Sequence, residues 1–153
     1  MDRSEREHLV LLETNIDDMN PEYYQYIMQR LFDGGALDVF LTPIIMKKER
    51  PAVKLSVLCE PDSADAMKDI VFRETTTFGI RIFEIQREKL DRSFAKVSTS
   101  YGEIKVKNGF LKGELVKSVP EYEDVKKAAA AHGVPIGKVY DEVIKVNLEQ
   151  RKG

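Results

Sequence analysis

Three acidic residues stand close together in a short segment near the N-terminus. Glu13, Asp17 and Asp18 come just before Asn20 and Pro21, a pair typical of a helix start. Carboxylates at this point can hold a hard divalent cation such as Mg²⁺ or Mn²⁺, which then bridges to the phosphates of a ligand. The alternative is that Asp17 or Asp18 only caps the helix, and on capping preference alone this role is the more common one. Burying three acids together is costly without a cation, so the segment is a candidate metal–phosphate corner.

A basic cluster lies at the predicted end of a strand and its turn. It consists of Lys47, Lys48 and Arg50. These side chains could surround a triphosphate, with the planar guanidinium of Arg50 making paired contacts to phosphate oxygens. The alternative is a solvated hairpin tip whose lysines protect a strand edge.

The segment Arg73–Arg81 carries three successive threonines between two arginines. The hydroxyls and backbone amides of Thr75, Thr76 and Thr77 can form a nest that binds an anion. Gly79 would let a ligand approach the backbone closely. The alternative is a polar turn between a helix and a strand, in which the β-branched residues begin the strand.

Other kinds of chemistry have little support in the sequence. His8, Cys59 and His132 are too scattered for a zinc-type site, and no P-loop motif occurs. The net charge of −2 argues against nucleic-acid binding, which favours a basic stripe. A single cysteine excludes a disulfide within the chain and suggests a reduced, cytoplasmic setting. No apolar run approaches the roughly 20 residues that cross a membrane.

The first half of the chain has the hydrophobic pattern of alternating strands and helices. One helix begins at Asn20 and ends before Gly34, and a second begins at Asp62 with capping-box spacing to Asp65. Pro43 indicates an edge strand or a bulge. Strands are predicted at residues 8–17, 36–48, 53–60 and 78–88. The order βαββαβ predicts an α+β, ferredoxin-like fold, in which two helices cover one face of an antiparallel four-stranded sheet.

The second half predicts a small β-meander followed by two C-terminal helices. Strands are expected at residues 94–100, 102–107 and 110–117, with Asn108-Gly109 as a tight hairpin turn. Ser118 is expected to start a helix that Gly133 ends, and Pro135 to begin the last helix. We therefore expect a ferredoxin-like subdomain at 1–89 and a second subdomain at 90–153, or one domain that includes both.

Five segments of the chain together resemble one protein family. They are Leu12–Met19, Gly35–Val39, Pro43–Pro51, Phe72–Arg81 and Pro120–Asp124. In this order they are similar to the C-terminal region of the LarC family, the nickel-insertion proteins of lactate racemase cofactor synthesis. The similarity extends from about residue 9 to about residue 148.

This resemblance implies a CTP-dependent cyclometallase, a metal chelatase of the lyase class. Such an enzyme inserts its substrate Ni²⁺ into a pyridinium bis-thiocarboxylic acid mononucleotide through a cytidinylylated intermediate and so makes the nickel pincer cofactor. The C-terminal region of the family binds CTP with Mg²⁺ or Mn²⁺ and oligomerises, so a homo-oligomer is expected. The family's larger N-terminal region is the implied partner, without which nickel insertion is expected to be incomplete.

If CTP binds, side-chain chemistry assigns the roles of the candidate residues. Glu13, Asp17 and Asp18 are the expected metal ligands. The expected nucleotide contacts are Lys47, Lys48, Arg50, Arg73, Thr75, Thr76, Thr77 and Arg81. The alternative is a non-catalytic, oligomerising ferredoxin-like module that senses a small ligand, which the fold alone permits.

Overall fold

The structure, a computed structural model, describes residues 6–150. The chain divides into two compact units, Glu5–Glu88 and the segment Lys89–Gly153. Residues 1–5 of the subdomain expected at 1–89, and residues 151–153 of the one expected at 90–153, lie outside the described residues. The two units are described separately below.

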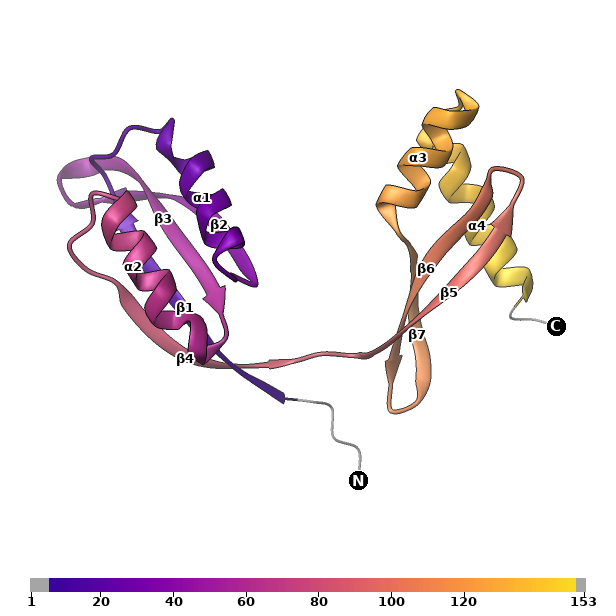
Figure 1. The fold of residues 1–153 in the computed structure, drawn as a ribbon, viewed down its shortest axis with the longest axis horizontal. Helices are drawn as coiled ribbons and strands as arrows, with labels where there is room; N and C mark the ends of the chain where they lie inside the picture. Colours follow the sequence, from indigo (N-terminus) through magenta and orange to yellow (C-terminus); the bar gives the residue numbers. More distant parts are fainter. Residues whose placement is uncertain (1–5, 151–153) are drawn as a thin grey trace. The chain divides into compact units, whose positions relative to one another are not determined.

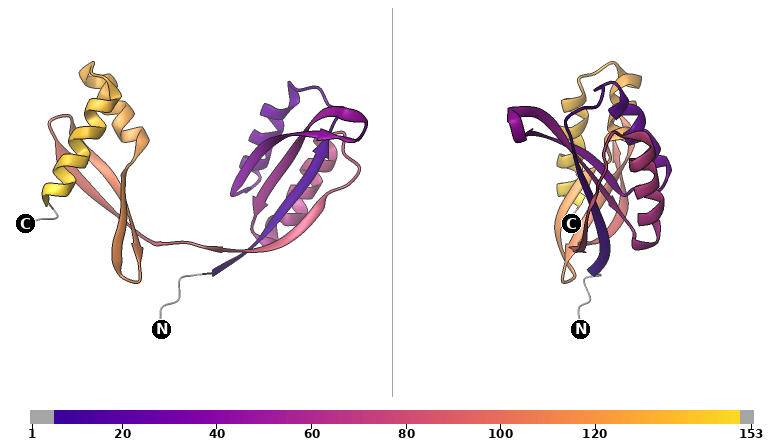
Figure 2. Two further views of the ribbon diagram at one scale, coloured as in Figure 1. Left: turned by 180° about the vertical axis from the view of Figure 1, so that it is seen from behind. Right: turned by 90° about the vertical axis from the view of Figure 1, so that its left-hand side faces the viewer.

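The first unit has the predicted ferredoxin-like arrangement. Its strands pair antiparallel in the order β2-β3-β1-β4, and both helices lie on one face of the sheet (Figures 1 and 2). The elements are β1 (Arg6–Ile16), α1 (Tyr23–Asp33), β2 (Asp38–Met46), β3 (Arg50–Cys59), α2 (Ala64–Glu74) and β4 (Arg81–Glu88). Two short 3₁₀ turns, Lys47–Glu49 and Pro61–Ser63, precede β3 and α2.

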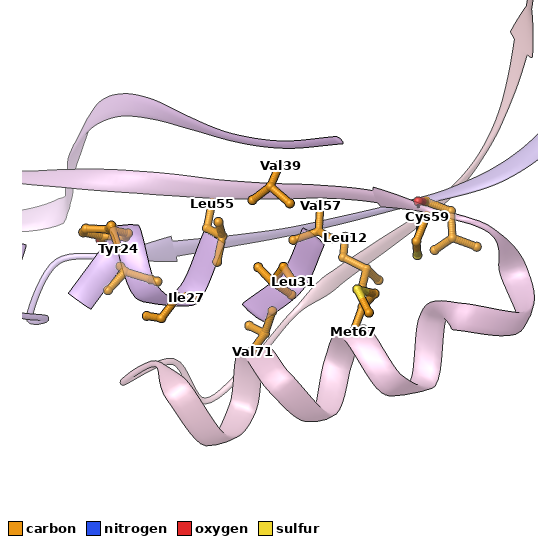
Figure 3. Close-up of a cluster of buried hydrophobic side chains, with 12 residues drawn as sticks. Leu12, Tyr24, Ile27, Leu31, Val39, Leu55, Val57, Cys59, Met67 and Val71 are labelled. Atoms are coloured by element: carbon orange, nitrogen blue, oxygen red, sulfur yellow. Dashed lines mark hydrogen bonds between the residues drawn. The ribbon is translucent and has the colours of Figure 1, made fainter. Parts of the chain in front are cut away.

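The core of this unit lies between the sheet and its two helices (Figure 3). Because strand side chains alternate between faces, β1 and β3 each direct every second residue into it. At the end of α1, a Cβ on Gly34 would stand only 2.9 Å from Met67 Cε of α2, so glycine permits this close approach. The main buried side chains are Leu12, Tyr24, Ile27, Leu31, Val39, Leu55, Val57, Cys59, Met67 and Val71.

The ends of several elements differ from those predicted. β2 is an edge strand, as Pro43 indicated. The last strand of this unit begins at Arg81 and not at Phe78, because the Gly79 carbonyl accepts hydrogen bonds from the Thr14 and Thr77 hydroxyls instead of joining the ladder. The capping box predicted from Asp62 is wrong: α2 begins at Ala64, and its N-cap residue Ser63 makes no side-chain capping hydrogen bond.

The second unit is the predicted β-meander with two helices. Its sheet has the order β5-β6-β7. The two helices cover one face of this sheet, and the core of the unit lies between that face and the helices. The elements are β5 (Asp91–Thr99), β6 (Gly102–Leu111), β7 (Glu114–Pro120), α3 (Tyr122–His132) and α4 (Ile136–Gln150). The core residues are Val97, Ile104, Val106, Val125, Ala128, Ala129, Val139 and Val143.

The hairpin turn predicted at Asn108-Gly109 is wrong. Both residues lie inside β6, and the turn falls at Lys112-Gly113, where φ is 50° and 79°. Two positive φ values in a row match the twist of a tight hairpin. Gly109 serves packing instead, since a Cβ there would approach Leu90 Cδ1 to 3.1 Å.

The helix predicted to start at Ser118 is also shorter than expected. Ser118 and Pro120 still belong to β7, and α3 begins at Tyr122 without a side-chain capping hydrogen bond from Glu121. The Ser118 hydroxyl instead donates to Asn108 Oδ1 at 2.7 Å, which ties β7 to β6. Over residues 6–150, no helix combines the length and apolar character needed to cross a bilayer.

Shortening a core side chain of α1 should destabilise the first unit. Leu31 is fully buried, so Leu31→Ala should cost about 2–5 kcal/mol of unfolding free energy, from lost transfer energy and an unfilled cavity. Ile45→Ala is the control, because Ile45 is 71% exposed, and its cost should stay within about 0.5 kcal/mol. Urea titration followed by amide NMR signals of β1 measures both; equal losses would contradict this description of the core.

Candidate functional site

The C-terminal end of β1 brings polar side chains to the sheet face that the helices leave uncovered. Thr14 and Ile16 point into the core, so Glu13, Asn15 and Asp17 point to the opposite face. β1 is a central strand, paired with β3 on one side and β4 on the other. Residues from three strands can therefore reach this group.

Glu13 and Asp17, the two carboxylates on this open face, each face a basic side chain. Lys54 Nζ lies 3.1 Å from Glu13 Oε1, and Arg81 Nη2 lies 3.7 Å from Glu13 Oε2. Arg81 also donates to Asn15 Oδ1 at 2.8 Å. Arg50 donates to Asp17 Oδ2 at 3.2 Å, which links the start of β3 to the end of β1. Acids and bases that the sequence places far apart thus meet at one end of the sheet.

The threonine segment folds over the same end of β1. The Thr76 hydroxyl donates to Asp18 Oδ1 at 2.6 Å. Thr14, only 3% exposed, donates to the Gly79 carbonyl at 2.8 Å, and its hydroxyl lies 2.6 Å from that of Thr77. The loop is therefore tied to the central strand by side-chain hydrogen bonds.

The basic turn and the two remaining candidates are placed differently. Lys47 and Lys48 lie in the 3₁₀ turn before Arg50. Lys48 has a φ of 62°, in the left-handed region, where the backbone of any residue other than glycine is strained. Arg73 does not reach the corner in this structure: its Nε donates to Asp69 on α2 at 2.8 Å. The Thr75 hydroxyl donates to the Val71 carbonyl and so ends α2.

The carboxylates do not form a closed metal cage by themselves. Over residues 6–150, no group of three or more His, Cys, Asp or Glu side chains is arranged to hold a metal ion. Asp18 is exposed and Asp17 is 18% exposed at the side chain. This donor set fits a Mg²⁺-type ion that takes one or two carboxylates and completes its shell with phosphate oxygens and water.

Burial affects one titrating group beneath the corner. Desolvation raises the pKa of the Tyr24 phenol above its ordinary value, and the negative charge of Asp18 adds to that rise. The phenol consequently stays neutral, and able to donate a hydrogen bond, throughout the physiological pH range.

Four residues of the corner were not predicted from the sequence. Lys54 stands between core residues of β3. A polar residue alternating with apolar ones occurs in any strand with one exposed face, so the sequence did not single it out. Thr14 looks like an ordinary strand residue. Phe78 is fully exposed, in the middle of the threonine loop. Ser56, opposite Glu13 in the β1–β3 ladder, is fully buried, and its hydroxyl has no hydrogen-bond partner in the described part of the chain.

Comparison with known proteins decides the family. Residues 1–140 match the family described as Nickel insertion protein. The chain belongs to this family. The resemblance to the LarC family is thereby confirmed, and it is supported by proteins named pyridinium-3,5-bisthiocarboxylic acid mononucleotide nickel insertion protein. The one from Clostridium kluyveri is 49% identical over 148 residues and the one from Clostridium acetobutylicum 51% over 143, covering 96% and 94% of this chain.

One solved structure supports the same family, and a second shares the fold. One is the apo form of LarC2, described as the C-terminal domain of a cyclometallase involved in synthesis of the NPN cofactor of lactate racemase. It is 37% identical, has a TM-score of 0.87, and covers 92% of this chain and 97% of its own. A protein from Methanopyrus kandleri, 24% identical with a TM-score of 0.69 over 91% of this chain and 88% of its own, shares the fold. This chain spans about a third of the two clostridial relatives, 37% and 34% of their lengths.

Removing the Thr14 hydroxyl should loosen the threonine loop. Thr14→Val keeps the shape of the side chain but loses its hydrogen bond to the Gly79 carbonyl, which should cost about 1 kcal/mol of stability. The amides of residues 76–80 should then exchange faster with solvent. Thr42→Val is the control, since the Thr42 hydroxyl makes no hydrogen bond within the described chain. Amide hydrogen exchange measures both variants, and indistinguishable loop protection would contradict the role of Thr14.

Proposed function

We propose that the first unit binds CTP with Mg²⁺ or Mn²⁺, and that it serves a nickel-insertion enzyme by activating the precursor of the nickel pincer cofactor. One observation carries the proposal: acidic, basic and hydroxyl side chains from separate segments meet at the end of β1. A nucleoside triphosphate with its metal requires all three kinds of group at once. Anionic phosphates need cations, the metal needs carboxylates, and the remaining oxygens need hydrogen-bond donors.

The relatives' names support the reaction. They describe insertion of nickel into pyridinium-3,5-bisthiocarboxylic acid mononucleotide, and LarC2 is described as part of a cyclometallase. In this proposal nickel and the mononucleotide are substrates, and the remainder of the longer relatives is the partner region. CTP activates the mononucleotide by transfer of its cytidinylyl group: an acidic oxygen of the precursor bonds to the α-phosphorus as the bond to pyrophosphate breaks.

The ion pairs of the corner are suited to exchange partners when the ligand arrives. In the present arrangement Arg50 neutralises Asp17 and Arg81 neutralises Glu13. A triphosphate draws both guanidinium groups to its oxygens, which frees Asp17 and Glu13 for the metal, and Asp18 joins them by exchanging its hydrogen bond from Thr76. Lys47 and Lys48 lie next to Arg50 in the chain and extend the same basic edge.

The threonine loop and Phe78 supply the remaining contacts. Thr76 and Thr77 offer hydroxyl donors, while Thr75 holds the end of α2 in place. The ring of Phe78 is fully exposed, and an exposed ring beside a phosphate site can stack on a nucleobase, which is worth about 1–3 kcal/mol. We assign it to the cytosine. Arg73 would join the site only by leaving Asp69.

The metal contributes charge neutralisation and orientation of the α-phosphorus when it is bound. The chain's own residues hold the triphosphate oxygens and keep the leaving pyrophosphate in a positive environment. Residues 1–89 form the nucleotide-binding subdomain in this proposal. Residues 90–153 form a second subdomain, and copies of the chain assemble into a homo-oligomer.

Two arginines on one strand give a matched test of nucleotide binding. Arg81 and Arg87 both lie on β4, and each pairs with a glutamate of β1, Glu13 and Glu7. Arg81→Gln should weaken binding of CTP in the presence of Mn²⁺ by about tenfold or more, because a charge-assisted phosphate contact is lost. Arg87→Gln should change it little, since Arg87 lies at the other end of the strand. Isothermal titration calorimetry measures both.

A second variant separates the metal from the phosphates. Asp17→Ala should weaken the Mn²⁺-dependent part of CTP binding without weakening the metal-free binding, because it removes a metal ligand and leaves Arg50 free to contact the phosphates. Equal affinity in wild type and Asp17→Ala would overturn the metal assignment. Absence of CTP binding combined with binding of a free amino acid would favour a small-ligand sensor instead.

A further inference from the structure

The sheet of the second unit has one face that its helices do not cover, and this face is basic. Strand side chains alternate between the two faces, and Val97, Ile104 and Val106 point toward α3 and α4. The intervening residues therefore face outward. In the ladder Arg92 stands opposite Gly109, and Gly109 stands opposite Lys117. A row across all three strands thus carries one cation on each side of a glycine.

A pocket of about 240 Å³ opens on this row. Four of its lining residues are cationic: Lys89, Arg92, Lys107 and Lys117. None of its lining residues within the described chain carries a carboxylate. The whole chain has a net charge of −2, so the positive charge of this pocket is opposite in sign to the net charge of the protein. Like charges brought together this way repel one another, and a bound anion would relieve that repulsion.

The inner surface of the pocket is apolar. Leu90 and Val119 line it together with Gly109. A Cβ at Gly109 would stand 3.1 Å from Leu90 Cδ1 and 3.6 Å from Lys117 Cβ, so a larger residue would fill the space between them. An apolar floor with a polar rim is the usual composition of a small-molecule site.

Three of the pocket's cations, Arg92, Lys107 and Lys117, form no strong ion pair with other groups of the described chain. Lys107 Nζ lies 3.8 Å from Glu121 Oε1, and both side chains are more than a third exposed, so solvent screens this pair strongly. Arg92 and Lys117 form no ion pair within residues 6–150. A ligand can therefore recruit them without breaking a strong contact.

We propose that this pocket binds a phosphate ester of a small ring compound. A phosphomonoester carries about two negative charges near neutral pH, which matches several cations better than a single carboxylate does. Arg92 suits paired contacts to phosphate oxygens, and the ring lies against Leu90 and Val119. The concave shape and small volume fit a molecule of this size better than a flat macromolecular surface. This class includes the mononucleotide substrate of the proposed function, so the choice of ligand rests on that function, while the pocket itself needs no CTP binding by the first unit.

A titration of the full chain with nicotinate mononucleotide tests the proposal. This probe carries a phosphate and a small aromatic ring. Amide NMR signals of Arg92, Gly109 and Lys117 should shift in a saturable manner. Arg92→Gln and Lys117→Gln should each weaken binding by about tenfold, the usual effect of losing one charge-assisted contact. Lys138→Gln, which removes a cation of α4 outside the pocket, should leave the affinity unchanged.

Two further probes and one variant separate the sources of binding. Nicotinate without the phosphate should not bind, and inorganic phosphate should bind more weakly than the mononucleotide. Equal affinity for inorganic phosphate and the mononucleotide would overturn the role of the apolar floor. Failure of the pocket signals to shift, or insensitivity to both pocket variants, would overturn the site. Arg81→Gln should have no effect, and loss of binding there would assign the ligand to the first unit instead.

Discussion

The central position of β1 is the constraint on which the rest of the first unit depends. This strand is hydrogen-bonded on both sides, so its residues alternate strictly between the core and the open sheet face. Leu12 and Ile16 anchor the helices, and the same alternation forces Glu13 and Asp17 outward to meet basic side chains. A shift of register by one residue would bury the acids and expose the core. Fold stability and site geometry therefore both depend on the register of β1 with its two neighbouring strands.

The sequence predicted those features that depend on periodicity. Helix faces, strand order and the edge position of Pro43 follow from local patterns that the packing reinforces. The hairpin was misplaced because Asn108-Gly109 has a strong local turn preference, whereas in the structure Lys112 and Gly113 supply the two positive φ values and Gly109 packs against Leu90 inside β6. The pairing of whole strands therefore decided between two local turn signals.

The site was predictable only in part, for a related reason. Residue types identified acids, bases and threonines as candidates, and the structure brings Glu13, Asp17, Asp18, Arg50, Thr76, Thr77 and Arg81 to one end of the sheet. Lys54 was missed, because a lysine alternating with apolar residues is common on any exposed strand. Arg73 looked equivalent to Arg81, yet its helical position lets Asp69 hold it one turn away. Which acid an arginine pairs with depends on the folded positions of both side chains, and residue types alone do not predict those positions.

The proline in β2 has a consequence for how the protein can associate. β2 is one of the two outer strands of the first sheet, and outer strands can recruit a strand from another molecule. Pro43 lies in the middle of β2 and has no N–H to offer. A continuous intermolecular ladder cannot form along this edge, which guards the unit against open-ended polymerisation. Backbone pairing between copies along the full length of β2 is therefore disfavoured, and the other outer strands, β4, β5 and β7, lack such a proline in their middle.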